Sequence, residues 1–120
     1  MLQNLATIRA TIDHLTQTKG HLLLTGSVAG RRAITGSLYA ATKHAVHAMA
    51  ENLRLEIVGS GVRVTVIAPG MTDTPFFASP IQLAEPLRDD DIASAVLYAL
   101  SQPPHVNVNE ILVRPTGQEL

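Results

Sequence analysis

Three short runs of apolar, largely β-branched residues constrain the fold more than any other feature of this sequence. They cover residues 21–25, 62–68 and 111–113, and the first two end directly in Gly26-Ser27 and Pro69-Gly70. Runs that are apolar along their whole length are typical of strands buried on both faces, which belong to parallel sheets. Proline stops a strand because it has no N–H for the ladder. We therefore expect three buried, parallel strands.

Segments with a helical pattern separate the three runs. Apolar side chains recur every three or four residues over 5–17, and residues 37–58 are rich in alanine and contain no glycine or proline. A third apolar segment begins at Asp89-Asp90-Asp91, where acidic and capping side chains favour a helix start, and Gln102-Pro103-Pro104 ends it. This order of helices and strands predicts an α/β fold with a parallel sheet and right-handed crossovers.

Composition limits the possible partners. The 120 residues suit a single domain, and a formal net charge of -1 offers no basic surface for nucleic acid or an anionic membrane. No segment approaches the ~20 apolar residues of a membrane span, and the N-terminus lacks the pattern of a secretion signal. Without cysteine there is no disulfide framework or thiolate metal site. We expect a cytoplasmic protein with a small-molecule partner and no metal.

Chemically useful side chains gather where the first two strands end. Ligands of open parallel sheets bind beyond the carboxyl ends of the strands, which is where Ser27 and Pro69-Gly70 fall. Tyr39 and Lys43, four residues apart on the following helix, lie on one face about one turn from each other. A phenol has a pKa of about 10 in water, and a nearby cation lowers it toward neutral pH. The pattern indicates proton transfer.

Three motifs in order resemble the short-chain dehydrogenase/reductase family. They are Gly26-Ser27-Val28-Ala29-Gly30, Tyr39-Ala40-Ala41-Thr42-Lys43 and Pro69-Gly70-Met71-Thr72-Asp73-Thr74. The resemblance implies that the catalytic residues are Ser27, which orients the substrate oxygen, Tyr39, the acid/base, and Lys43. It implies NAD or NADP as cofactor, with contacts from seven residues: Tyr39, Lys43, Pro69, Gly70, Met71, Thr72 and Thr74.

The resemblance covers the C-terminal half of the family's Rossmann-type, doubly wound parallel sheet. The glycine-rich phosphate loop is absent; Gly26-x-x-x-Gly30 follows the wrong strand and has Arg32 in place of the third glycine. The Asn-Ala-Gly motif is also missing, and Asn4 lies too late to match the asparagine of the catalytic tetrad. Residues 1–120 are therefore expected to form a partial NAD(P)-binding domain that lacks the nucleotide-binding half.

Two functions from different classes follow. The first is an NAD(P)-dependent oxidoreductase that transfers hydride between the cofactor and a carbonyl or secondary alcohol. The second is a truncated, catalytically inert fragment that acts only by associating with a partner. A sugar-nucleotide epimerase or dehydratase keeps the Tyr39/Lys43 pair, but the segment from Met71 to Leu87 is short for its substrate domain. A serine hydrolase is disfavoured because Ser27 is not in a nucleophile elbow.

The remaining features bear on substrate and assembly. Phe76, Phe77 and Leu83 suggest an apolar lid, and hence a lipid-like, steroid-like or xenobiotic carbonyl or alcohol substrate. Ala41, Ala45 and Ala48 form a small-residue helix face, which in the resembling family suits a homo-oligomer interface and which intrachain packing explains equally well. His44 and His47 have a chelating spacing, but no carboxylate-rich motif accompanies them, so no metal site is predicted.

Overall fold

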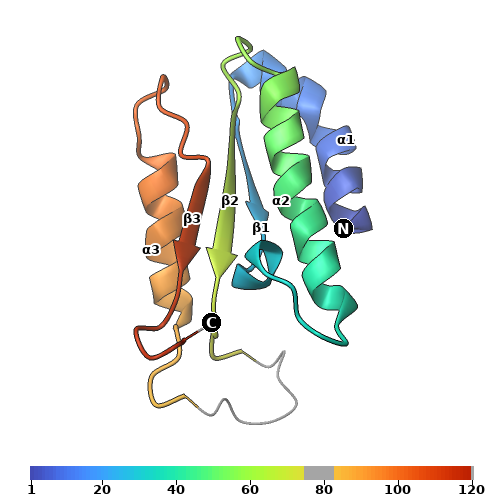
Figure 1. Cartoon of the computed structure of the whole chain (residues 1–120). Helices are drawn as coiled ribbons and strands as arrows, with labels where there is room; N and C mark the ends of the chain where they lie inside the picture. The colour runs from blue at the N-terminus through green and yellow to red at the C-terminus, as the bar shows by residue number, and fades with distance from the viewer. Residues whose placement is uncertain (75–82, 120) are drawn as a thin grey trace.

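Figure 1 shows the computed structural model of the chain, which describes residues 1–74 and 83–119. Helices and strands alternate as the sequence predicts, with one addition, a short 3-10 helix (η1) in the segment expected to be loop. The elements are α1 (Leu2–Thr18), β1 (His21–Thr25), η1 (Val28–Arg31), α2 (Leu38–Glu56), β2 (Arg63–Pro69), α3 (Asp89–Leu100) and β3 (Glu110–Val113).

The three strands form one parallel sheet in the order β1-β2-β3 (Figure 1). Leu22 pairs with Val64 in β1 and β2, and Val66 pairs with Glu110 in β2 and β3. All three strands therefore end at the same edge of the sheet, which confirms the α/β fold. β2 is central, and its residues 64–68 are all buried.

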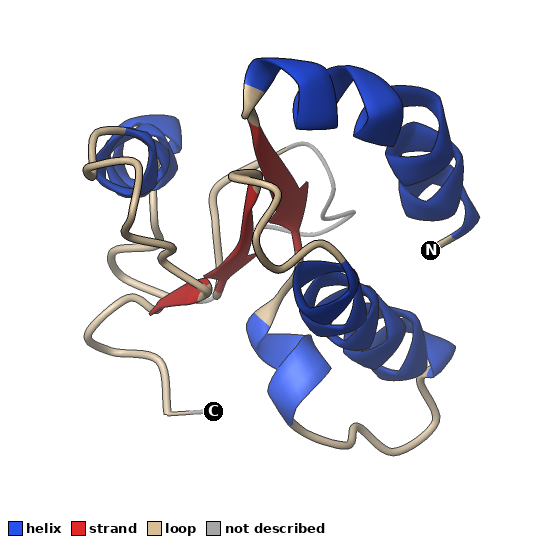
Figure 2. Cartoon of the chain, turned by 90° about the horizontal axis from the view of Figure 1, so that it is seen from above, coloured by secondary structure: helices blue, strands red, loops and turns tan. Residues whose placement is uncertain are grey.

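The two faces of the sheet are covered by different helices. Val64, Val66 and Ala68 of β2 join a core with Val46 and Ala50 of α2. The same core includes half-buried side chains of α1, at Ile8, Ile12 and Leu15. Side chains alternate along a strand, so Thr65 and Ile67 face the opposite side, where α3 lies (Figure 2).

This placement of helices corrects the expected handedness of the crossovers. The steps β1 to β2 and β2 to β3 run in the same direction across the sheet, but α2 and α3 lie on opposite faces. Two such connections have opposite hand, so at most one of them is right-handed.

β1 lies at the edge of the sheet, as expected for a strand without its second neighbour. In the part of the chain that the structure describes, β1 pairs with β2 alone. Gly26 N donates to Ile67 O at 2.7 Å and Arg63 N donates to Gly20 O at 3.1 Å. The even-numbered residues of β1 thus face β2. The backbone groups of the odd-numbered residues, including Leu23, point outward along an open edge.

The helix ends follow the sequence signals closely. α1 ends at Lys19, which adopts the left-handed conformation with φ 52°. The three aspartates lie in the first turn of α3, but the residue at the capping position is Arg88, whose backbone N donates to Asp91 Oδ2 at 2.8 Å.

Within residues 1–74 and 83–119, no helix combines the length and the apolar character needed to cross a membrane.

Candidate active site

A cavity of about 600 Å³ opens where β1 and β2 end. All eight residues predicted from the sequence to act in catalysis or cofactor binding line it: Ser27, Tyr39, Lys43, Pro69, Gly70, Met71, Thr72 and Thr74. Arg32, Ile34 and Gln118, which the sequence analysis did not assign to the site, also line the cavity. Residues 75–82, including Phe76 and Phe77 of the predicted lid, lie outside the described residues.

Two other hollows are slightly larger, so size does not identify the site. One, of about 650 Å³, lies against α2 and Glu110, and the other, of about 750 Å³, lies against the start of α3. Neither contains the hydroxyl, phenol and ammonium groups that share the 600 Å³ cavity. The chemistry of the lining therefore selects the cavity at the strand ends.

Ser27 lies two residues after the end of β1 and is the capping residue of η1. Its Oγ accepts a hydrogen bond from Ala29 N at 3.1 Å, the usual contact of a capping serine. The residue is buried but lines the cavity. A hydroxyl that accepts one bond keeps its own O–H as a donor, so Ser27 can donate to an oxygen atom of a ligand.

Tyr39 and Lys43 lie together in the first turns of α2, as their spacing predicts. Lys43 Nζ is 5.5 Å from the centroid of the Tyr39 ring. The same Nζ is 3.5 Å from Thr25 O at the end of β1. Tyr39 is 42% exposed, so a ligand in the cavity can reach the phenol. The phenol and the ammonium group therefore share one wall of the cavity.

The turn after β2 is held by the end of β3 and by the chain segment that follows it. Gly70 N donates to Val113 O at 2.7 Å, and Met71 N donates to Gln118 Oε1 at 2.8 Å. A Cβ atom on Gly70 would overlap the Gln118 side chain, so only glycine permits this approach. Thr72 Oγ1 donates to Gly70 O at 3.1 Å. No local sequence pattern predicts this contact, which joins residues 47 positions apart.

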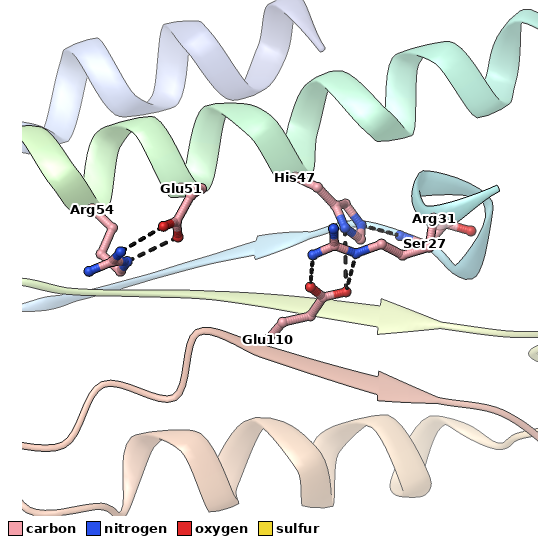
Figure 3. Close-up of polar contacts among 6 residues, drawn as sticks. All are labelled: Ser27, Arg31, His47, Glu51, Arg54 and Glu110. Atoms are coloured by element: carbon pink, nitrogen blue, oxygen red, sulfur yellow. Dashed lines mark hydrogen bonds and ion pairs between the residues drawn. The ribbon is translucent and has the colours of Figure 1, made fainter. Parts of the chain in front are cut away.

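A polar cluster lies behind Ser27, between α2 and β3, in which His47 is buried, Glu110 is half-buried and the Arg31 side chain is exposed (Figure 3). Arg31 of η1 forms two hydrogen bonds to Glu110, one of them from Nε to Oε1 at 3.0 Å. Ser27 N donates to His47 Nε2 at 3.3 Å. His47 Nδ1 is 3.4 Å from Glu110 Oε1, within ion-pair distance but outside hydrogen-bond geometry. The only sequence signal at His47 is its chelating spacing from His44, for which no metal site is predicted.

Burial and the guanidinium group of Arg31 are the main causes of the pKa shifts in the cluster. Burial is the main cause that lowers the pKa of His47 below its ordinary value. The hydrogen bonds from Arg31 are the main cause that lowers the pKa of Glu110. The cluster therefore consists of a neutral imidazole beside an ion pair at neutral pH.

Comparison with known proteins decides the family. Residues 4–82 match the family described as short chain dehydrogenase. The chain belongs to the short-chain dehydrogenase family. The matched region of this short-chain dehydrogenase includes Ser27, Tyr39, Lys43 and the turn after β2, and it stops before β3 and Gln118.

Curated relatives of this short-chain dehydrogenase carry the name oxidoreductase. An uncharacterized oxidoreductase of Staphylococcus epidermidis is 43% identical over 111 residues, which are 90% of this chain and 48% of the relative. One from Staphylococcus aureus is 49% identical over 104 residues, which are 84% of this chain and 45% of the relative. The chain thus spans about half the length of the curated relatives that it matches.

Solved structures show the same fold. The closed form of a serine dehydrogenase complexed with NADP+ has a TM-score of 0.90 and 29% identity, over 98% of this chain and 53% of that one. An alcohol dehydrogenase from the archaeon Thermococcus sibiricus, complexed with 5-hydroxy-NADP, has a TM-score of 0.86 and 31% identity, over 100% of this chain and 52% of that one. The sheet is therefore half of a Rossmann-type fold.

Proposed function

We propose that this short-chain dehydrogenase transfers hydride between NAD or NADP and a carbonyl or secondary alcohol substrate. One observation carries the proposal: the hydroxyl of Ser27, the phenol of Tyr39 and the ammonium group of Lys43 line a single cavity. These groups come from the loop after β1 and from α2, and the turn after β2 forms the facing wall. Both solved relatives named above are complexes with NADP or a derivative of it, which supports the cofactor class.

The lining of the cavity fits the nicotinamide end of such a cofactor. Apolar side chains at Val28, Ile34 and Met71 suit a flat ring, and hydroxyl groups at Thr72 and Thr74 suit a carboxamide. A bound nicotinamide supplies or accepts the hydride. We propose that residues 1–120 form the catalytic half of the nucleotide-binding domain, because the chain contains no glycine-rich phosphate loop.

Each catalytic side chain has a distinct task in this proposal. Tyr39 gives a proton to the substrate oxygen in reduction and takes it back in oxidation. Ser27 donates a hydrogen bond to the same oxygen, which orients the carbonyl and stabilises the developing charge. Lys43 would hold the ribose hydroxyls of the cofactor, and its positive charge lies beside the Tyr39 ring, with Nζ 5.5 Å from the ring centroid.

The test is cofactor-dependent turnover by the purified chain. Absorbance of NADH and NADPH is followed with a panel of aldehydes, ketones and secondary alcohols, for the native chain and for Tyr39→Phe. We expect turnover that requires the cofactor and disappears in Tyr39→Phe. Tyr98→Phe is the matched control, because Tyr98 lies on α3, is 58% exposed and does not line the cavity. Turnover that survives in Tyr39→Phe would contradict the assigned role.

A second function is favoured by the open edge of β1. An edge strand with outward-pointing N–H and C=O groups pairs readily with another strand. In this alternative the chain is catalytically inert and acts only through association with a partner chain. Absence of any cofactor-dependent absorbance change, together with a mass above 12.8 kDa in light scattering, would favour it. Association into a homo-oligomer through Ala41 and Ala48, which are exposed on α2, is part of the same test.

A further inference from the structure

We propose that His47 is a positioning residue for Ser27, held in the required tautomer by Glu110 and Arg31. The inference rests on the proposed role of Ser27 in orienting the substrate oxygen. His47 does not line the cavity that Ser27, Tyr39 and Lys43 share, so it acts through the backbone of Ser27.

The segment from Gly26 to Gly30 packs directly against the imidazole ring of His47. A Cβ on Gly26 would lie 2.6 Å from His47 Cδ2, and one on Gly30 would lie 2.7 Å from Nε2. Glycine at both ends of the Gly26–Gly30 segment therefore lets the backbone contact the ring closely on both sides of Ser27. The side chain of His47 is 4% exposed, and it lies between the Gly26–Gly30 segment and the hollow of about 650 Å³ that Arg31 and Glu110 also line.

The hydrogen bond from Ser27 assigns the protonation state of the ring. His47 Nε2 accepts from Ser27 N at 3.3 Å, so Nε2 carries no proton. A neutral imidazole has one N–H, which must then be on Nδ1. Nδ1 faces Glu110 Oε1 at 3.4 Å, and a carboxylate favours a donor there. The orientation of Glu110 is in turn set by the two hydrogen bonds from Arg31.

Protonation of the His47 ring would remove the acceptor atom that Ser27 N uses. A doubly protonated imidazole presents an N–H at Nε2 to the N–H of Ser27, and two donors repel each other. The charged groups around the ring come from three elements: Glu110 of β3, Arg31 of η1, and Lys43 and His44 of α2. Burial, Arg31, His44 and Lys43 all favour the neutral ring, and only Glu110 opposes them. The contact to Ser27 is therefore present near neutral pH and is lost in acid.

Nitrogen NMR on the intact chain tests the inference without relying on catalysis. Imidazole ¹⁵N shifts report which ring nitrogen is protonated, and the Ser27 amide resonance reports its hydrogen bond. We expect a protonated Nδ1 and a bare Nε2 at pH 7.5, and a Ser27 amide shift that follows the His47 titration as pH falls. A protonated Nε2 at pH 7.5, or a Ser27 amide that does not respond to the titration, would overturn the proposal.

Two variants separate positioning from simple packing. Glutamine at position 47 offers an amide oxygen as acceptor at every pH, so His47→Gln is expected to keep the Ser27 amide hydrogen bond and to abolish its pH response. Leucine offers no acceptor, so His47→Leu is expected to lose the bond. His14→Gln is the control, because His14 is an exposed histidine on α1. Equal Ser27 shifts in the glutamine and leucine variants would contradict the assignment.

Kinetics distinguish this inference from the function on which it rests. In an active preparation, His47→Leu is expected to lower kcat by roughly 10- to 100-fold, as misplacement of a catalytic group does, with little change in KM for the cofactor. His47→Gln is expected to restore most of kcat. If Ser27→Ala leaves turnover unchanged while the NMR results hold, the proposed role of Ser27 fails. If Ser27→Ala abolishes turnover but Ser27 ignores the His47 titration, the positioning fails alone.

Discussion

Lys43 extends over the ring of Tyr39, with Nζ 5.5 Å from the ring centroid, while the same atom is 3.5 Å from the last carbonyl of β1, at Thr25. The ammonium group thus joins the start of α2 to the end of the edge strand. The position of Lys43 Nζ therefore depends on both β1 and α2, and the proposed site depends on that position.

Replacement of this ammonium group should reduce turnover without unfolding the chain. In Lys43→Met we expect kcat to fall by about 100-fold, because the charge that supports proton transfer by Tyr39 is lost. Thermal unfolding should change little, because Nζ makes a long, partly exposed contact. Lys19→Met is the control, since Lys19 is exposed at the end of α1. Comparable loss of turnover in both variants would argue against a specific role.

Alanine at either glycine that flanks Ser27 should destabilise the fold. Neither Gly26 nor Gly30 has a positive φ, so the steric overlap with His47 is the main effect. We expect the free energy of unfolding in urea to fall by about 1–3 kcal/mol in Gly26→Ala and in Gly30→Ala. Gly117→Ala should change it by less than about 0.5 kcal/mol, because a Cβ there meets only an ordinary contact at 3.5 Å.

A double-mutant cycle identifies the cause of that loss. If His47 is the obstacle, adding His47→Ala to Gly26→Ala should recover part of the stability lost in the single glycine variant, giving a coupling of about 1 kcal/mol. Strict additivity of the two substitutions would show that the glycine serves another purpose.

Removal of the Gln118 side chain should loosen the turn after β2. The amide of Gln118 accepts from Met71 N at 2.8 Å in a half-buried environment. In Gln118→Ala we expect the unfolding free energy to fall by about 1 kcal/mol and the Met71 amide proton to exchange faster. Gln17→Ala on the exposed side of α1 is the control. Unchanged exchange at Met71 would mean that another group satisfies this N–H.

Stability should fall as the pH is lowered from about 7.5. The pKa of His47 and of His21 is lowered in the folded state, chiefly by burial, so the unfolded chain binds protons first below the ordinary histidine value of 6.5. The lowered pKa of Glu110 adds a loss further down, below its ordinary value of 4.5. Urea titrations at several pH values measure both phases. His47→Gln should flatten the first phase, and a stability that rises toward acid would contradict the assignment.

The sequence predicts which residues line the cavity at the strand ends better than it predicts the packing behind that cavity. Ser27, Tyr39 and the turn at Pro69 were placed together because carboxyl ends of parallel strands share one edge and because residues four apart on a helix are neighbours. These are local rules. They require only that each element be recognised in order.

The supporting contacts join residues far apart in the chain, and local rules do not reach them. His47 is 20 residues from Ser27, Gln118 is 47 from Met71, and Glu110 is 79 from Arg31. The face on which α3 packs is likewise decided by the whole sheet. One signal was available: glycine at both ends of the Gly26–Gly30 segment indicates a close neighbour, although not which residue it is.

The 79-residue separation of Arg31 and Glu110 has a consequence for synthesis on the ribosome. The strands β1 and β2 and the helix between them can form early, because their contacts are closer in sequence. The contact of Arg31 with Glu110 behind Ser27 forms only after β3 has left the exit tunnel and docked. Premature termination upstream of Glu110 would therefore yield a chain that contains every predicted catalytic side chain. That chain would lack the contact between Arg31 and Glu110 that supports the loop around Ser27.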